Sequence, residues 1–180
     1  TSIVPVVVHD LPGVAASSSP ATICSGAIAA LTASSPALPA YCVPTYFTGT
    51  GFGDFCASVA IAGTALNNVT TGAASPFYTL YPASGATTAA LVAGNTYTIT
   101  LGAGTYCCNN NLAAWIDYDQ NHTLNEGLEK LGETGYIGGS STGSFVFTVP
   151  SWAINGVTRL RVREIFATTG LTSCDATSYG

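Results

Sequence analysis

The chain has 180 residues, of which 47% are hydrophobic and only 7% charged, with a formal net charge of -5. This length suits one domain with or without an arm, and the acidic balance argues against nucleic acid and anionic membranes as partners. No apolar run is long enough to span a bilayer. Because so weakly charged a surface repels its own copies poorly, we expect it to be covered by sugar or to contact further copies.

Residues 1–10, TSIVPVVVHD, predict a short apolar strand. Pro5 has no amide hydrogen, which places this strand at a sheet edge or makes it an added strand. We interpret it as a donor strand that adds to the sheet of a neighbouring copy. The side chains that would fill the acceptor groove are Ile3, Val4, Val6, Val7 and Val8. An ordinary first strand of the same domain and a disordered segment are the alternatives.

Residues 11–40 are rich in Ala, Ser and Pro and predict a linker, with one short helix near residues 20–31. Residues 1–40 together therefore form a predicted N-terminal arm, long enough to reach another subunit. A head-to-tail contact that does not close generates a filament.

Short β-type runs separated by Gly, Asn and Pro turns fill residues 41–180. Their alternation of apolar and polar residues has a period of two, which is typical of strands with one face buried. Many short strands at this spacing predict an all-β fold, a β-sandwich of the jelly-roll type. The expected strands lie within residues 54–63, 75–82, 95–104, 112–119, 143–150 and 157–167.

The six cysteines form no Cys-x-x-Cys pair and stand near no histidine, so they predict disulfides in an oxidising compartment rather than zinc. Adjacent cysteines rarely bond each other because the ring is strained, so we expect separate partners for Cys107 and Cys108. A bond between Cys42 and Cys174 would close the body end to end. The remaining two bonds would then use Cys24, Cys56, Cys107 and Cys108. The start at Thr1 rather than Met indicates a processed mature form.

Five of the nine acidic residues fall between residues 117 and 133. Calcium takes about six to eight oxygen ligands, and calcium loops supply them from alternate residues. The predicted ligands are the side chains of Asp117, Asp119 and Asn121, the carbonyl of Thr123 and a closing Glu129. The loop is not an EF-hand, because Glu129 stands one position too late and His122 replaces the turn glycine. A solvated acidic turn is the alternative.

Three further features have weaker interpretations. Asn68 lies in the sequence Asn-Val-Thr, an acceptor pattern for N-glycosylation. The three arginines of residues 159–163 share one face of a strand, where we expect them to pair with acids or to face solvent. Aromatic residues would form either core or a sugar-binding platform, namely Tyr41, Tyr46, Phe47, Phe77, Tyr78 and Tyr81.

Catalysis is not predicted. The two histidines, His9 and His122, have no nucleophile or acid partner at a recognisable spacing, and no phosphate-binding loop occurs.

The stretches YCVPTY (41–46), AAWIDYDQNHTLNEGLEKLGE (113–133) and FTVPSWAINGVTRLRVRE (147–164) occur in an order and spacing that resemble the GEVED-domain family of secreted bacterial proteins. The resemblance covers residues 41–180. It implies a calcium-compatible β-sandwich in a secreted or surface-attached protein, with Asp117, Asp119, Asn121 and Glu129 at the acidic positions of the family.

This chain departs from the family pattern in two places. Asn-His stands where Asp-Gly is usual, which implies weaker calcium binding. The name-giving Gly-Glu-Val-Glu-Asp-Tyr motif would begin at Gly180, so either the chain continues or the motif has been lost.

The sequence therefore predicts a secreted, extracellular bacterial structural subunit with no enzymatic activity. It assembles with its own copies into a fibre by strand donation and is stabilised by calcium and disulfides. The alternative is a carbohydrate-binding or adhesive accessory module of a larger secreted protein, with glycans as partners.

Overall fold

The computed structural model describes residues 15–19, 30–34 and 40–180. The chain divides into two compact units, Thr1–Pro39 and Ala40–Gly180, next to the boundary predicted between residues 40 and 41. The predicted donor strand, with Ile3 and its four valines, and Cys24 lie outside the described residues. Within the described part, no helix is long and apolar enough to cross a membrane.

The first unit contains an antiparallel pair of strands, β1 (Ala15–Ser19) and β2 (Ala30–Ser34). Ala15 stands opposite Ser34. The sequence predicted a linker here, but the structure differs because the two short runs satisfy each other's main-chain hydrogen-bonding groups. Most of the helix predicted for residues 20–31 falls outside the described residues, and its last two positions lie in β2.

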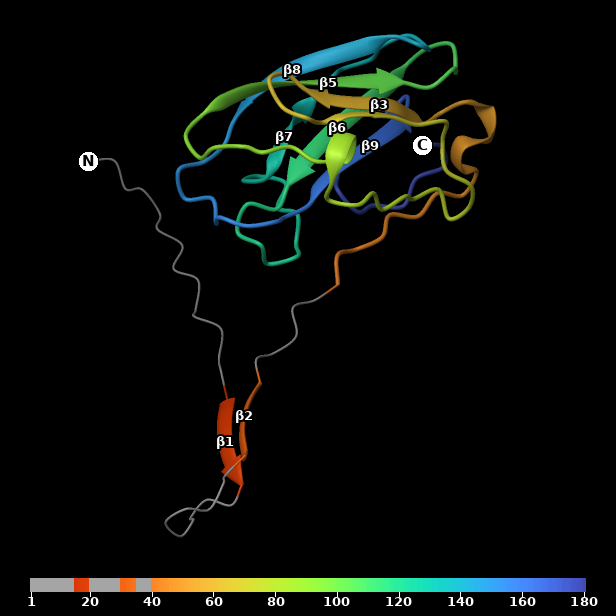
Figure 1. The fold of residues 1–180 in the computed structure, drawn as a ribbon. Helices are drawn as coiled ribbons and strands as arrows, with labels where there is room; N and C mark the ends of the chain where they lie inside the picture. Colours follow the sequence, from red (N-terminus) through yellow and green to blue (C-terminus); the bar gives the residue numbers. More distant parts are fainter. Residues whose placement is uncertain (1–14, 20–29, 35–39) are drawn as a thin grey trace, which may run out of the picture. The chain divides into compact units, whose positions relative to one another are not determined.

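The second unit is a sandwich of two antiparallel sheets, which confirms the predicted all-β fold (Figure 1). One sheet has the order β4-β3-β5-β8 and the other the order β7-β6-β9. The strands are β3 (Cys56–Ile61), β4 (Asn67–Val69), β5 (Thr96–Ala103), β6 (Asn110–Ile116), β7 (Lys130–Glu133), β8 (Thr142–Thr148) and β9 (Leu160–Phe166). Two single-turn 3-10 helices, η1 (Gly49–Phe52) and η2 (Gly85–Thr87), lie in the connections.

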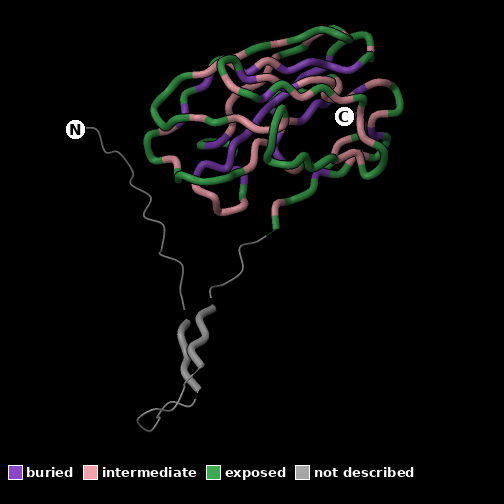
Figure 2. The backbone as a smooth tube through the Cα atoms, in the orientation of Figure 1, coloured by how far each residue is buried: buried purple, intermediate pink, exposed green. Residues whose placement is uncertain are grey.

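The main core fills the space between the sheets, where the buried residues concentrate (Figure 2). Strand β5 shows how the alternating pattern produces it. Ile99 and Leu101 are fully buried, whereas Thr100 turns the other way and shares a 2.8 Å hydrogen bond with Ser144 of β8. Strand β5 thus presents apolar side chains to the opposite sheet and polar ones to the outer face.

Strand β6 is buried on both faces. Leu112, Ala114 and Ile116 belong to the main core, while Ala113 and Trp115 belong to a second cluster on the outer face of the smaller sheet. Leu124 of the acidic loop and Leu171 of the C-terminal segment cover that cluster. The covering explains why the loop that follows β6 is fixed in place rather than loosely solvated.

The strand prediction holds for β3, β5, β6, β8 and β9, but residues 75–82 form no strand. Phe77 has a left-handed backbone with φ of 63°, which interrupts an extended run that its aromatic and threonine content favoured. The short strands β4 and β7 were not predicted. Asn68, of the predicted glycosylation pattern, lies in β4.

The cysteines partly correct the sequence interpretation. Cys42 and Cys174 are bonded as expected, with Cα atoms 6.0 Å apart. Cys107 and Cys108, expected to have separate partners, are bonded to each other in the turn between β5 and β6. Cys56, expected to form a disulfide, is a free cysteine; it lies in β3 against the main core, and its thiol contacts the carbonyl of Ser58.

Within the described residues, Arg161 and Arg163 of β9 neither face solvent nor pair with acids, contrary to the prediction. Arg161 donates to the carbonyls of Cys42 and Ser173, and Arg163 donates to those of Thr172 and Asp175. Both are buried. Backbone oxygens from distant segments replace the expected carboxylates, so these arginines fasten the two ends of the second unit onto the smaller sheet.

Candidate metal centre

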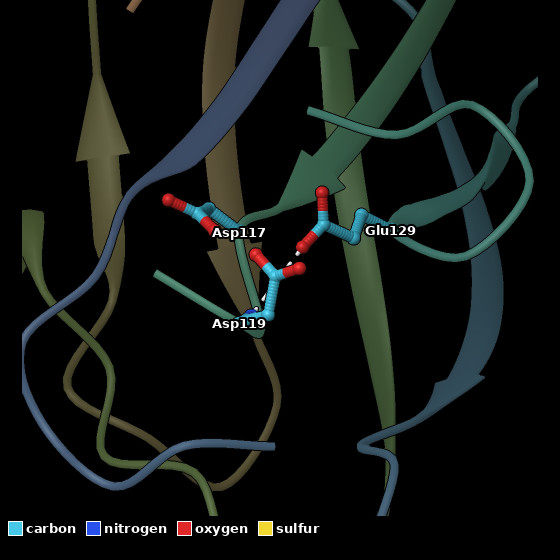
Figure 3. A group of neighbouring side chains, drawn as sticks. All are labelled: Asp117, Asp119 and Glu129. Atoms are coloured by element: carbon cyan, nitrogen blue, oxygen red, sulfur yellow. Dashed lines mark hydrogen bonds between the residues drawn. The ribbon is translucent and has the colours of Figure 1, made fainter. Parts of the chain in front are cut away.

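The acidic loop leaves β6 at Asp117 and returns to the sheet at Lys130 in β7. Its carboxylates converge: one oxygen each of Asp117, Asp119 and Glu129 lie within 4.8 Å of one another (Figure 3). Asp117 and Glu129 are buried, and Asp119 is partly exposed at the mouth of the group. Strand β6 and the start of β7 are paired in the sheet, so the two ends of the loop are fixed at the site.

Backbone amides of the loop hold these carboxylates in position. Oδ1 of Asp117 accepts a hydrogen bond of 3.2 Å from the Asn121 amide, and Oδ2 accepts one of 3.0 Å from His122. Oε1 of Glu129 accepts from the Tyr118 amide at 2.8 Å, and Oε2 accepts from Asn125 at 2.7 Å. The loop thus winds around its acids, as in a preorganised ion site.

The backbone conformation of the loop makes this winding possible. Gln120 and His122 adopt left-handed φ angles of 55° and 67°. A glycine adopts such a conformation without strain, whereas a side chain makes it less favourable. The Asn-His pair that replaces Asp-Gly therefore keeps the loop shape at some energetic cost.

Burial of the group disfavours its negative charge. The pKa of Glu129 is raised, chiefly because burial removes water, with the nearby Asp119 charge acting in the same direction; amides of Asn125 and Tyr118 partly oppose the shift. The pKa of Tyr118 is also raised, by burial and by Glu129. A cation among three such oxygens would offset the repulsion, and a donor set of carboxylates suits calcium or magnesium rather than a softer metal.

Of the five predicted ligands, the structure brings three together. The side-chain amide of Asn121 donates to Asp119 at 2.9 Å, and its oxygen accepts from the Thr123 amide at 2.6 Å. Thr123 itself is exposed. The three carboxylates therefore fit a calcium ion, and the remaining positions of its shell would be filled by water or by main-chain oxygens.

The other two acids of the segment serve the packing of the C-terminal residues. Glu126 accepts hydrogen bonds from the Trp115 indole at 2.8 Å and the Ser173 amide at 2.6 Å. Burial raises the pKa of Glu133, but hydrogen bonds from Lys130, Asn111 and the Leu171 amide outweigh it and leave that pKa lowered. Acidic residues are thus concentrated in residues 117–133 for two reasons. Three of them form the candidate ion site, and Glu126 and Glu133 bind the C-terminal residues.

An aromatic wall adjoins the metal group. The Tyr41 hydroxyl donates to Asp117, its ring stacks on His122 with centroids 4.6 Å apart, and the Arg159 guanidinium lies 4.0 Å from the ring centre. Behind this wall runs a groove of about 910 Å³. Five of the six predicted platform aromatics line it, Tyr41, Tyr46, Phe77, Tyr78 and Tyr81, whereas Phe47 is exposed elsewhere. Asn68 lines it too.

Comparison with known proteins bears on the segment that carries this site. The family model described as GEVED domain matches residues 111–180, a shorter range than the resemblance from residue 41 onward. No curated protein matches the chain, and no solved structure does. The matched range begins in β6 and includes the whole acidic loop, β7, β8 and β9. Residues 111–180 are therefore similar to the GEVED domain, in agreement with the resemblance seen in the sequence.

Proposed function

We propose that this chain is a structural subunit that assembles with its own copies into an extracellular fibre by N-terminal strand donation, stabilised by calcium. The observation that carries the proposal is the groove of the second unit, which opens into the core. Val59 and Ile61 of β3, both counted in the main core, line it together with Leu66. An open groove with apolar residues in its walls can accept further apolar chain.

The composition supports the same conclusion. The apolar run of residues 3–8 carries no charge, and only 7% of all residues are charged. Several large apolar side chains of the second unit are more than half exposed, among them Phe47, Val146 and Val157. Such a surface favours contact with other protein over long-lived monomers.

Calcium has a structural role in this proposal. The loop of residues 117–129 covers the cluster around Trp115, and an ion held by Asp117, Asp119 and Glu129 would fix that cover. The Cys42–Cys174 bond supports an oxidising, extracellular location.

Electron microscopy of negatively stained full-length protein tests the proposal. We expect filaments in calcium, and their loss when residues 1–10 are deleted. Dispersed particles from the intact chain in calcium, at concentrations where the deleted form is equally soluble, would contradict the assembly.

A carbohydrate-binding or adhesive module is the second candidate. The observation that favours it is the lining of the groove by five aromatic residues together with Arg159, since aromatic faces stack on sugar rings and arginine binds acidic groups. In that case the chain stays monomeric and is retained on a polysaccharide column, and Tyr78→Ala reduces the retention.

A further inference from the structure

Strand β9 has one free edge. In the part of the chain that the structure describes, β9 pairs only with β6. The carbonyl of Arg159 accepts from Asp117, and the amide of Ala167 donates to Asn109, both on the β6 side. Backbone direction alternates along a strand, so the odd-numbered residues of β9 face β6 and the even-numbered ones face away. Leu160, Val162 and Glu164 therefore direct their amides and carbonyls outward, and the carbonyl of Glu164 lies against Gly180 of the C-terminal segment.

That free edge forms a wall of the groove. Five consecutive residues, 160–164, line the groove. Consecutive residues point to opposite faces of a sheet, so a run of this kind means that the edge itself is open to the groove. Across from it lie Val59 and Ile61 of β3 and Leu91. The groove thus combines unpaired main-chain groups with apolar walls, which are the two features that an added strand uses.

One end of the groove holds a buried carboxyl group whose hydrogen bonds are unmade. Both carboxylate oxygens of Glu164 lack a hydrogen-bond partner among the described residues, although the side chain is only 2% exposed. Oδ1 of the nearby Asp54 also lacks a hydrogen-bond partner among the described residues. Buried polar groups in folded proteins are almost always paired, so these oxygens leave hydrogen-bonding capacity for a further group at this place.

The sequence of residues 1–10 fits this edge. Pro5 cannot donate a hydrogen bond, so its backbone must face away from the acceptor strand. In an added strand, the residues that face the acceptor would then be Val4, Val6 and Val8, with all three side chains on one face. An uncharged strand with three valines on one face matches the apolar walls of the groove.

We propose that the free edge of β9, from Leu160 to the amide of Glu164, is the acceptor for residues 3–8 of a second copy, with Val4, Val6 and Val8 making the main-chain hydrogen bonds. This inference rests on the proposed fibre assembly and names its docking site. Because Ala15 pairs with Ser34, residues 9–14 and 35–39 separate residues 3–8 from the sandwich along the chain, and a stretch of that length spans at most about 40 Å when fully extended.

Site-specific cross-linking tests where the strand docks. The chain contains no methionine, so Val6→Met carrying photoreactive methionine labels the strand at one internal position. Fibres are assembled from equal amounts of isotopically light and heavy protein and then irradiated. We expect residue 6 to be joined to groove residues such as Val59, Leu66 or Val162, with half of the pairs mixed in isotope. Links confined to single copies, or links to the β7 or β8 edge, would overturn the proposal.

A pair of proline variants tests the hydrogen-bonding pattern. Val6→Pro removes an amide that faces β9, whereas Val7→Pro removes one that faces away, and the two lose equal apolar surface. Binding is measured as inhibition of fibre growth by synthetic peptides of residues 1–10. We expect the Val6→Pro peptide to be at least tenfold weaker than the parent and the Val7→Pro peptide to stay within threefold. Equal losses, or the reverse order, would contradict the assigned register.

The outcomes separate this inference from the function on which it rests. Fibres that form normally but give cross-links outside the groove leave the structural role intact and remove the acceptor. An intact chain that forms no fibres, while its groove residues are linked to residue 6 of the same copy, removes the assembly and the second copy together.

Discussion

The indole nitrogen of Trp115 donates a hydrogen bond of 2.8 Å to Oε2 of Glu126, eleven residues later in the chain. The other oxygen of the same carboxylate accepts from the Ser173 amide at 2.6 Å. One acid of the loop thus joins the fully buried tryptophan of β6 to the C-terminal segment. The contact shows that the acidic side chains of this loop also hold the fold together, apart from any role in binding an ion.

Replacement of Glu126 by alanine should destabilise the second unit by about 3 kcal/mol, because two donors lose their acceptor and one of them, the Trp115 indole, is fully buried. Denaturant unfolding followed by tryptophan fluorescence measures the change. Glu126→Gln, which keeps one acceptor oxygen, should cost about 1 kcal/mol. Calcium binding should survive in both variants, and a loss of calcium binding in Glu126→Gln would place Glu126 in the ion site instead.

Calcium should raise the melting temperature of the protein. The Asp119→Asn variant should need at least ten times more calcium for the same increase. The variant keeps the size of the side chain but removes one of three converging charges. A ligand present at 100 times its dissociation constant stabilises a folded protein by about 2.7 kcal/mol, which gives a readily measured shift in melting temperature. Asp175→Asn, at an exposed acid outside the group, is the control.

The same titration has an expected pH dependence. Because burial raises the pKa of Glu129, calcium must displace a proton from it at a higher pH than from an ordinary glutamate. Calcium affinity should therefore fall on acidification, starting at a higher pH than for a solvated carboxylate. A calcium effect that is absent at pH 7.5, or equal in parent and Asp119→Asn, would remove calcium from the proposed function.

How far the sequence predicts this structure depends on whether a pattern is local. Alternation along β5 and β8 predicts those strands because burial of every second residue is a property of one segment. The acceptors of Arg161 and Arg163 are not local. They are carbonyls of Cys42 and of residues 172–175, and a carbonyl is present at every residue, so no pattern marks it.

In the metal loop, too, some features follow from a local sequence pattern and others depend on the folded chain. The spacing of Asp117, Asp119 and Glu129 predicts their convergence, because a winding loop turns alternate residues inward. The separate roles of Glu126 and Glu133 depend on amides of residues 170–173, which reach the loop only in the folded chain. The open edge of β9 is likewise a property of the sheet order and not of any one segment.

Loss of the Cys42–Cys174 bond should lower the free energy of unfolding by about 4 kcal/mol, because the bond closes a loop with a sequence separation of 132 residues. The double variant Cys42→Ser, Cys174→Ser tests this by denaturant unfolding. Native contacts should persist, since Arg161 still donates to the carbonyls of Cys42 and Ser173. Cys107→Ser with Cys108→Ser is the control, because adjacent residues enclose almost no chain. A larger loss in the control than in the long-range pair would contradict the expected ranking.

Glu164 should make the stability of the subunit fall as pH rises. Burial, followed by repulsion from Asp54, raises its pKa from 4.5 to about 8. The folded state therefore holds a proton that the unfolded state releases above pH 4.5, so the contribution of Glu164 is full below that pH and is lost as pH rises towards 8. Each pKa unit corresponds to about 1.4 kcal/mol, which makes the total several kcal/mol.

Glu164→Gln removes this titration while keeping the shape of the side chain. We expect parent and variant to have similar stability at pH 4 and the variant to be more stable at pH 8, in denaturant unfolding of protein kept monomeric by deletion of residues 1–10. Glu129 also has a raised pKa and adds the same sign of slope to both proteins, so only their difference reports on Glu164. Parallel curves from pH 4 to pH 8 would mean that the carboxyl of Glu164 has found a hydrogen-bond partner, and an added donor strand should produce that same flattening in the assembled fibre.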